Sequence, residues 1–267
     1  MDIAERALAF HDLHSQPAPL RLPNAWDAGS ARLVEHLGAQ AIATTSAGVA
    51  WSLGYRDGDV LPVGQHLAAI ERIARMLTVP LSVDIEGGYA DDPHQVGEHV
   101  ARFIAAGAAG INIQDGAGSP ERLCEKIEQA RKAAQRLGVK LYINVRTDVY
   151  ARGLVEPQAR VAETLDRARR YASAGADGLF VLGVVDREEI HAIAAGTRLR
   201  LNVIAWPGLP PVAELGALGV RRVSAGSWLP QQLWARTTEL ASGFLADGRS
   251  QPLIEGAAPY AQVNGFF

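Results

Sequence analysis

One phrase recurs along the chain and constrains its fold more than any other feature. A segment with the residue pattern of a helix ends at a glycine. A small or β-branched residue follows, and a short apolar run then begins. A glycine just past the last helical turn adopts the left-handed backbone conformation that ends a helix. A short continuous apolar run is typical of a parallel strand that is buried on both faces. The phrase therefore predicts repeated helix–strand units, and it occurs at Gly38, Gly107, Gly138, Gly175 and Gly219.

The apolar runs predict the strands, and the segments between them predict the helices. We expect about eight strands, near residues 20–24, 41–45, 80–84, 110–114, 140–146, 178–182, 199–203 and 222–224. Helices are expected near 27–37, 64–77, 93–106, 120–137, 158–174, 187–194, 211–218 and 228–246. Two of these helices have Pro at their first position, Pro93 and Pro120, which is a good start signal.

Strict alternation without a break in composition favours one closed parallel barrel, a (β/α)8 TIM-type domain over residues 1–267. A doubly wound open sheet would alternate in the same way, but no G-x-G-x-x-G motif follows the first strand. Residues 1–18 are expected to form an extra N-terminal helix. Residues 247–267 form a tail that either packs on the barrel or swaps to a partner subunit.

Charge and cysteine content exclude several functional classes. The 26 Lys and Arg residues are balanced by 29 Asp and Glu, which argues against a generic nucleic-acid binder. Cys124 is the only cysteine, so an internal disulfide framework and a multi-thiolate zinc site are excluded. No signal peptide or membrane-spanning segment is visible in the sequence, so we expect a cytoplasmic protein.

Acidic residues gather where three neighbouring strands end, which is where barrel enzymes hold their active sites. Asp84 and Glu86 are two residues apart and point the same way if the strand persists through them. With Asp115 on the next strand they form a candidate oxygen-only site for Mg²⁺, which takes one or two carboxylates and keeps several waters. The alternative is an acidic cluster that is neutralised by Arg146 and nearby lysines.

Two further features at the strand ends suit an anionic substrate. Arg146 is fitted to a bidentate grip on a carboxylate or phosphonate, or it forms a salt bridge that supports Asp84 or Glu86. The turn after the second strand, around Ser46 and Ala47, is rich in hydroxyl groups, and its backbone amides could hold an anion.

Five motifs, in order, resemble those of the isocitrate lyase / phosphoenolpyruvate mutase superfamily. They are PNAWDAGSA at 23–31, TSAG at 45–48 with GYRD at 54–57, VDIEGGY at 83–89, IQDG at 113–116 and NVRTD at 144–148. The resemblance covers roughly residues 20–230. It implies a (β/α)8 barrel, commonly tetrameric with a swapped C-terminal helix. It also implies Mg²⁺-dependent chemistry on 2-oxo acids through an enolate.

The resemblance assigns roles residue by residue. Asp84 matches a metal ligand, while Glu86 and Asp115 match acids that hold metal-bound waters. Arg146 and the Ser46–Ala47 turn match groups that bind the substrate, and Asn202 matches a late strand-end substrate position. Asp57 matches an acid near the reacting centre. The proton donor is open among Tyr55, Tyr89 and a metal-bound water.

Two departures from the superfamily pattern shape the expected function. Gln114 stands where many members have Glu, and the stretch 116–122 (GAGSPER) lacks the Cys and His of the isocitrate lyase lid. We therefore expect a Mg²⁺-dependent lyase or decarboxylase of a small 2-oxo or 2-hydroxy dicarboxylic acid, oxaloacetate being one candidate, acting in a homo-oligomer. The alternatives are phosphonate chemistry, of the mutase or phosphonopyruvate hydrolase type, and a barrel that binds a 2-oxo acid without turnover.

Overall fold

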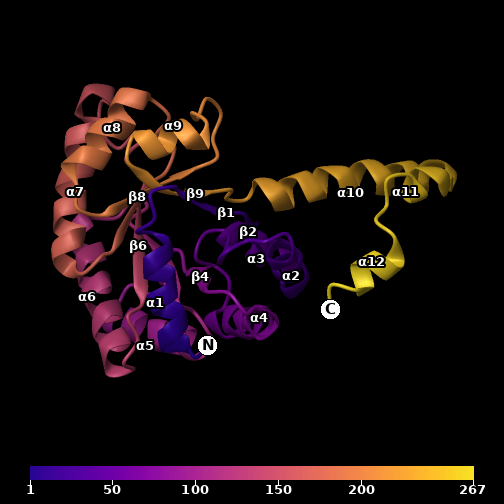
Figure 1. Cartoon of the computed structure of the whole chain (residues 1–267), viewed down its shortest axis with the longest axis horizontal. Helices are drawn as coiled ribbons and strands as arrows, with labels where there is room; N and C mark the ends of the chain where they lie inside the picture. The colour runs from indigo at the N-terminus through magenta and orange to yellow at the C-terminus, as the bar shows by residue number, and fades with distance from the viewer.

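A computed structural model describes residues 1–267 as a closed ring of parallel strands surrounded by helices (Figure 1). The strand segments are β1 (Leu20–Leu22), β2 (Asn24–Ala25), β3 (Ile42–Thr44), β4 (Leu81–Asp84), β5 (Gly110–Gln114), β6 (Tyr142–Thr147), β7 (Gly178–Val181), β8 (Arg200–Ile204) and β9 (Val220–Ser224). Their order around the sheet is β1-β9-β8-β7-β6-β5-β4-β3-β2. The expected (β/α)8 barrel is confirmed.

The ring closes through its first strand, which Pro23 divides into β1 and β2. β1 pairs with β9, and β2 pairs with β3, both in parallel. Proline has no N–H to donate to a strand ladder, so the two halves can turn toward different neighbours at this residue. The nine segments therefore make an eight-stranded barrel.

The helices follow the strands as the sequence predicts, with three additions. They are α1 (Ile3–Leu13), α2 (Ala28–His36), α3 (Ser46–Ser52), α4 (Val63–Met76), α5 (Pro93–Ala105), α6 (Pro120–Arg136), α7 (Arg160–Ala174), α8 (Arg187–Gly196), α9 (Val212–Ala217), α10 (Trp228–Asp247), α11 (Gln251–Ile254) and α12 (Tyr260–Asn264). One addition is α3, because residues 46–52 form a short helix and not only the turn expected there; the other two, α11 and α12, lie within the tail expected at 247–267. All five glycines of the recurring phrase have positive φ, between 67° and 112°.

Side chains alternate along the barrel strands between an apolar layer and a polar interior. On β6, Ile143 and Val145 belong to the large hydrophobic cluster between strands and helices, whereas Asn144 is a buried polar residue. Such alternation follows from the two-residue period of a strand. The polar residues between the apolar ones therefore line the inside of the ring.

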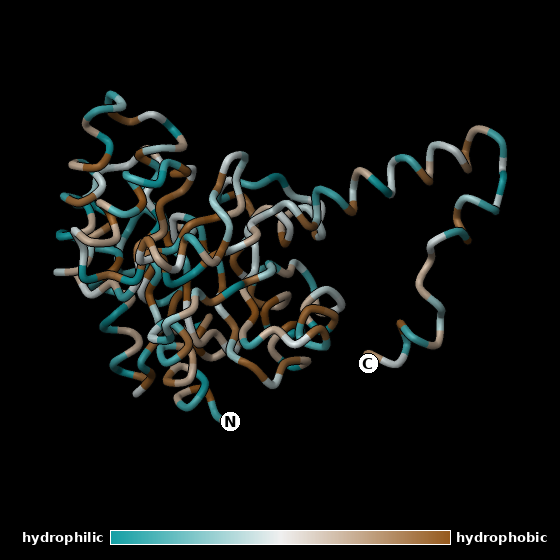
Figure 2. The backbone as a smooth tube through the Cα atoms, turned by 45° about the horizontal axis from the view of Figure 1, so that its top comes forward, coloured by the Kyte–Doolittle hydropathy of each residue, from teal (hydrophilic) through white to brown (hydrophobic).

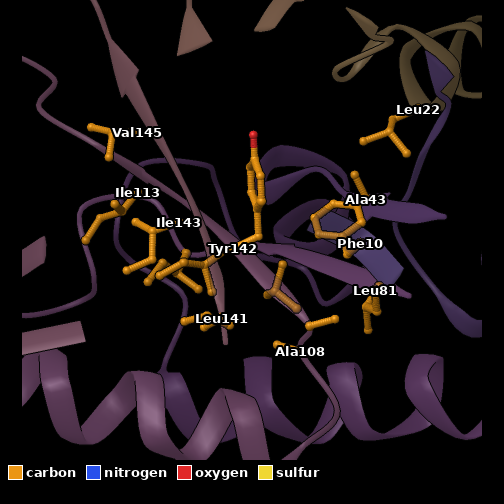
Figure 3. Packing of buried hydrophobic residues seen from close by; sticks show 14 of the residues in the cluster. Phe10, Leu22, Ala43, Leu81, Ala108, Ile113, Leu141, Tyr142, Ile143 and Val145 are labelled. Carbon is orange, nitrogen blue, oxygen red and sulfur yellow. The ribbon is translucent and has the colours of Figure 1, made fainter. Parts of the chain in front are cut away.

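α1 closes the amino-terminal end of the barrel. The ring of Phe10 meets that of Tyr142 edge-on at 5.4 Å between centroids, and His14 stacks on Tyr142 at 4.0 Å. Figure 3 shows Phe10 beside the Tyr142 ring, with the Tyr142 hydroxyl pointing away from Leu141 and Ala108. A side chain at Gly110 would lie 2.7 Å from Phe10, so this close approach requires glycine.

The C-terminal segment leaves the barrel as an arm. Figure 1 shows α10 extending away from the ring, and Figure 2 shows hydrophobic and hydrophilic residues alternating along it. The chain end returns to its own α2, where Arg32 Nε donates to the carbonyl oxygen of Phe266 at 2.7 Å. None of the helices combines the length and apolar character needed to cross a lipid bilayer.

Candidate active site

A cavity of about 350 Å³ lies at the carboxyl ends of the strands. Its lining includes Ser46 and Ala47 at the start of α3, Asp84 at the end of β4 and Arg146 near the end of β6. Asp57, from the loop between α3 and α4, lines the same cavity. The fold therefore brings two carboxylates, a guanidinium and the start of a helix to one place, as five of the sequence predictions require.

Asp84 is the most constrained carboxylate of the cavity. Its Oδ2 accepts a hydrogen bond from Ser46 N–H at 3.3 Å, and its Oδ1 accepts one from Glu86 N–H at 3.2 Å. Burial raises the pKa of Asp84, and the positive charge of Arg146 offsets this only in part. No ion pair joins the Asp84 carboxylate to a cation in the structure, so its charge is incompletely balanced.

Arg146 is oriented by a carboxylate that does not face the cavity. Its Nε and Nη2 donate to the two carboxylate oxygens of Asp148 at 2.6 and 2.9 Å, and Arg152 Nε donates to Asp148 Oδ2 at 2.9 Å. This bidentate pairing fixes the plane of the Arg146 guanidinium while the residue still lines the cavity. The Arg146 guanidinium is thus paired with Asp148 and forms no ion pair with Asp84.

Glu86 joins two loops instead of facing the cavity. Its Oε2 accepts hydrogen bonds from Gly58 N–H at 2.9 Å and Asp59 N–H at 2.5 Å, and its Oε1 accepts one from Tyr89 O–H at 3.1 Å. In return, Asp59 Oδ1 accepts hydrogen bonds from the N–H groups of Gly87 at 3.1 Å and Tyr89 at 3.3 Å. We call this reciprocal set of bonds the loop clasp.

The loop clasp holds strained backbone and perturbs an acid. Asp59, Glu86 and Tyr89 all have left-handed φ values, of 57°, 51° and 58°, which are unfavourable for residues other than glycine. Burial raises the pKa of Glu86 to about 7; the hydrogen bond from Asp59 opposes this, and the negative charge of Asp57 adds to it. The clasp therefore fixes the loop that carries Asp57 beside the cavity.

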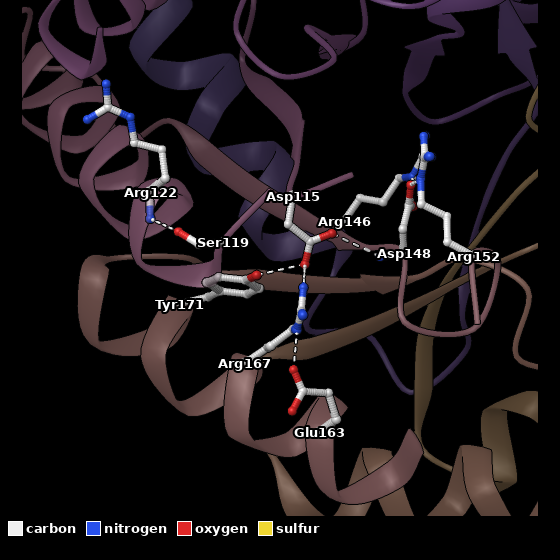
Figure 4. Close-up of polar contacts among 9 residues, drawn as sticks. All are labelled: Asp115, Ser119, Arg122, Arg146, Asp148, Arg152, Glu163, Arg167 and Tyr171. Carbon is white, nitrogen blue, oxygen red and sulfur yellow. Dashed lines mark hydrogen bonds and ion pairs between the residues drawn. The ribbon is translucent and has the colours of Figure 1, made fainter. Parts of the chain in front are cut away.

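Asp115 is saturated by protein donors (Figure 4). Its Oδ2 accepts hydrogen bonds from Arg167 Nη1 and Tyr171 O–H, both at 2.7 Å, and its Oδ1 accepts one from Asp148 N–H at 3.0 Å. Arg167 and Tyr171 belong to α7, and Asp115 and Arg167 are both buried. Asp115 thus joins β5 to α7 and to the loop after β6, and it supports the wall of the site.

The expectation that Asp84, Glu86 and Asp115 converge on one ion is not met. No group of three His, Cys, Asp or Glu side chains in the structure is arranged to hold a metal. The reason is that Glu86 is engaged by the neighbouring loop, and Asp115 by α7. Of the three, only Asp84 lines the cavity, together with Asp57. Two incompletely balanced carboxylates beside open space fit a hard divalent ion that keeps most of its waters.

Two other predicted residues lie outside the cavity. Tyr55 lines a separate apolar pocket with Trp51 and Trp234, and its hydroxyl accepts a hydrogen bond from Gln65 at 2.8 Å. Asn202 is fully buried below the cavity, where its Oδ1 accepts a hydrogen bond from Asn144 at 2.9 Å. The catalytic role expected of Tyr55 and the substrate contact expected of Asn202 are therefore not supported by their positions.

Several residues that shape the site were given no role from the sequence, although Asn24 lies in the first of the five motifs. Asn24 ties two strand ends together, because its Nδ2 donates to the Thr44 carbonyl and its Oδ1 accepts from Gly226 N–H, both at 2.8 Å. Phe180 and Trp206 supply apolar walls to the cavity. Arg167 is the one case with a usable signal, since it is a charged residue on the otherwise buried face of its helix.

Comparison with known proteins agrees with this arrangement. A profile of phosphoenolpyruvate phosphomutase matches residues 10–245. An uncharacterized protein of Mycobacterium tuberculosis is 37% identical over 259 residues, which cover 96% of this chain and 95% of that protein. The oxaloacetate decarboxylase of Bradyrhizobium sp. BTAi1 is 31% identical over 209 residues, covering 74% of this chain and 69% of the enzyme.

A solved structure is similar over nearly its whole length. It is a protein of Burkholderia cenocepacia J2315, provisionally called a phosphonomutase, with 40% identity and a TM-score of 0.85. The match covers 89% of this chain and 99% of that one. Together with the profile match and the ordered motifs at the strand ends, these similarities establish that the chain belongs to the phosphoenolpyruvate phosphomutase family, within the isocitrate lyase / phosphoenolpyruvate mutase superfamily of carbon–carbon lyases and mutases.

Proposed function

We propose that this protein is a Mg²⁺-dependent carbon–carbon lyase or decarboxylase that acts on a small 2-oxo or 2-hydroxy dicarboxylic acid through an enolate. One observation carries the proposal: Asp84 and Asp57 share a cavity of about 350 Å³ with Arg146. Carboxylates on one side suit a metal ion, and a guanidinium on the other suits a substrate carboxylate. A cavity of this size holds a small acid.

The metal would be held by Asp84, with Asp57 nearby and with water completing the shell. Glu86 and Asp115 would act at one remove, since their oxygens already accept hydrogen bonds from the protein. A bound divalent ion would polarise the 2-oxo group and stabilise the negative charge that builds up in the transition state.

The remaining groups of the cavity would bind and orient the substrate. Arg146, fixed by Asp148, would hold one carboxylate. The Ser46 N–H already donates to Asp84, so the Ala47 N–H, which has no partner within its own helix, would hold another oxygen beside the Ser46 hydroxyl. Phe180 and Trp206 would exclude water from the enolate.

A panel of 2-oxo and 2-hydroxy dicarboxylic acids, with and without Mg²⁺, tests this proposal. We expect release of pyruvate or glyoxylate from at least one acid, dependent on the metal and lost in Asp84→Ala. Metal-independent release, or full activity in Asp84→Ala, would contradict the mechanism. Ligand binding by calorimetry without turnover of any acid would instead favour a binding protein.

Phosphonate chemistry is the second candidate, favoured by the phosphomutase profile. Phosphorus NMR of the protein with phosphonopyruvate and Mg²⁺ distinguishes the two. A new phosphorus signal would identify rearrangement or hydrolysis of the P–C bond, whereas an unchanged spectrum beside an active lyase assay would remove this candidate.

We also propose that the protein is a homo-oligomer in which the arm is exchanged. A largely apolar groove, lined by Leu13, Val34, Leu37 and Leu229 among others, runs beside α2 and α9. On α10, the apolar side chains of Leu233, Trp234 and Leu245 are exposed. Exposed apolar surfaces of this kind mark interfaces.

Light scattering tests the arm exchange. Trp234→Glu should dissociate the oligomer, whereas Arg236→Glu, a polar control on the same helix, should leave it intact. Intact oligomers in both variants would contradict the exchange.

A further inference from the structure

Arg222 is a buried guanidinium that no role described so far explains. It lies on β9 and has no exposed surface. Its only side-chain hydrogen bond runs from Nη2 to Asn112 Oδ1 at 3.2 Å, while Nε and Nη1 have no partner. No carboxylate forms an ion pair with it. Asp84 is the one carboxylate whose charge attracts Arg222, and it does so at longer range, without an ion pair.

Other unpartnered polar atoms surround Arg222 inside the barrel. Asn112 Oδ1 also accepts a hydrogen bond from Asn144 Nδ2 at 2.9 Å, which places Asn144 beside the guanidinium. A side chain at Gly178 would lie within 2.8 Å of both Asn144 Oδ1 and the Tyr142 hydroxyl, so these two oxygens are close to each other. Neither oxygen has a hydrogen-bond partner.

The floor of this region is formed by His14. Its Nδ1 contacts the Phe10 carbonyl oxygen at 2.7 Å, so Nδ1 carries the proton and Nε2 is left as a buried acceptor without a partner. Burial, and next the charge of Arg222, lower the pKa of His14 to about 3, so the ring is neutral. Burial raises the pKa of Tyr142, so its hydroxyl keeps its proton and is no counter-charge to Arg222.

The unpartnered atoms are richer in donors than in acceptors. Arg222 offers one N–H from Nε and two from Nη1, and Tyr142 offers an O–H. Only His14 Nε2 and Asn144 Oδ1 are pure acceptors. A buried charge without a counter-charge is strongly unfavourable, and buried donors without acceptors are unfavourable too. A negatively charged acceptor would relieve both.

We propose that the barrel interior, below the catalytic cavity, binds a small monovalent inorganic anion of the halide class at Arg222 Nε and Nη1. The single positive charge and the enclosed position select such an ion over a dicarboxylate or phosphate. Arg222 does not line the catalytic cavity, and α1 closes the opposite end. The site is therefore separate from the substrate site and serves the stability of the barrel.

Bromide diffraction tests the proposal directly. Crystals of the wild-type protein grown in sodium bromide, measured at the bromine absorption edge, should show an anomalous peak within about 3.5 Å of Arg222 Nε or Nη1. Ordinary density that is fully explained by water molecules, with no anomalous peak, would overturn the proposal. The map needs no variant and no activity, so it is independent of the proposed function.

Thermal unfolding supplies the solution test. Replacing gluconate by chloride at constant ionic strength should raise the Tm by about 2–3 °C for each tenfold step above the Kd. Arg222→Met should lose this response. Arg221→Met is the matched control, because Arg221 is the neighbouring residue and donates to the carbonyls of Gly216 and Val220 instead; it should keep the response. Equal responses in the two variants would overturn the site, and if Arg222→Met does not fold, the bromide map decides.

Discussion

The carboxylates at the mouth of the barrel fall into two groups. Asp57 and Asp84 line the catalytic cavity, and no cation pairs with either in the structure. Glu86 follows the same strand as Asp84, and Asp115 follows the neighbouring strand β5, yet their oxygens accept hydrogen bonds from other parts of the protein. We refer to the first pair as the cavity acids and to the second as the wall acids.

The difference arises from donors that are distant in sequence. Asp115 is bound by Arg167 and Tyr171 of α7, 52 and 56 residues away. Glu86 is bound by the N–H groups of Gly58 and Asp59, in a loop that precedes it by nearly 30 residues. The end of a barrel strand therefore determines where an acid lies, whereas the neighbouring elements determine whether it is free to bind a ligand.

Asp84→Asn should have the largest effect on activity. The amide keeps the shape of the side chain but removes the charge that would hold a divalent ion. We expect the Mg²⁺-dependent kcat/KM to fall by about a thousandfold or more, a loss typical for a main electrostatic group of an active site. A steady-state assay on the substrate found in the acid panel measures this. A fall of less than tenfold would contradict the metal-binding role proposed for Asp84.

Asp115→Asn should have the largest effect on stability. It weakens a buried ion pair and leaves the Arg167 charge with only Glu163 as a partner. We expect the free energy of unfolding to fall by about 3 kcal/mol, measured by chemical denaturation. Asp166→Asn is the control: Asp166 pairs with Arg169 and Arg170 at the surface of the same helix, so its loss should cost less than about 1 kcal/mol. Equal losses of unfolding free energy in the two variants would contradict the structural role of Asp115.

Asp59→Asn tests the loop clasp that separates Glu86 from the cavity. Asn tolerates the left-handed backbone of this position, so the substitution removes charge without adding strain. The N–H groups of Gly87 and Tyr89 would lose a charged acceptor. We expect KM to rise about tenfold, because ordering the loop for substrate binding would then cost roughly 1.4 kcal/mol more free energy.

Hydrogen exchange of residues 54–60 gives a readout for the loop clasp that does not depend on activity. Exchange should quicken in Asp59→Asn and stay unchanged in Asp91→Asn, which removes an exposed carboxylate without hydrogen bonds from the neighbouring loop. Unchanged exchange in both variants would mean that the clasp does not order the Asp57 loop.

The smallest predicted effect is a gain in stability. The raised pKa of Asp84 means that the folded protein disfavours its charged form, so Asp84→Asn should stabilise the metal-free protein by about 1 kcal/mol at neutral pH. Unfolded Asp loses its proton near pH 3.9, whereas folded Asp84 holds its proton to higher pH. The gain should therefore appear as pH rises through this window and vanish below about pH 4.

Asp148 provides the opposite sign for this pH test. Burial acts to raise its pKa, but the hydrogen bonds and charges of Arg146 and Arg152 outweigh this and lower it. Its contribution to stability is therefore present above the unfolded pKa and is lost as pH falls. Denaturation curves of the two Asp→Asn variants between pH 3 and 8 should diverge in opposite directions from wild type, and parallel curves would contradict the assignment. That pH range is roughly the span over which carboxylates titrate in proteins.

Local sequence signals were sufficient for the barrel itself. Gly107, Gly175 and Gly219 follow their helices with the left-handed φ that the recurring phrase implies, and the apolar runs after them are strands. These signals are local, because a helix end and a buried strand each depend on a few consecutive residues. The short helix α3 was missed because its small residues, Ser46 to Gly48, are typical of turns as well.

The sequence by itself determined the order of helices and strands, the ring they form and the end of the ring where Asp84 and Arg146 meet. Only the tertiary structure decided that Glu86 and Asp115 serve the walls, that Asn202 lies below the cavity, and that Arg222 is buried without an ion pair. The reason is physical: strand alternation fixes the direction of a side chain, but hydrogen-bond donors and solvent exposure come from residues far along the chain. Whether a carboxylate is a free ligand or a structural acceptor depends on those distant partners.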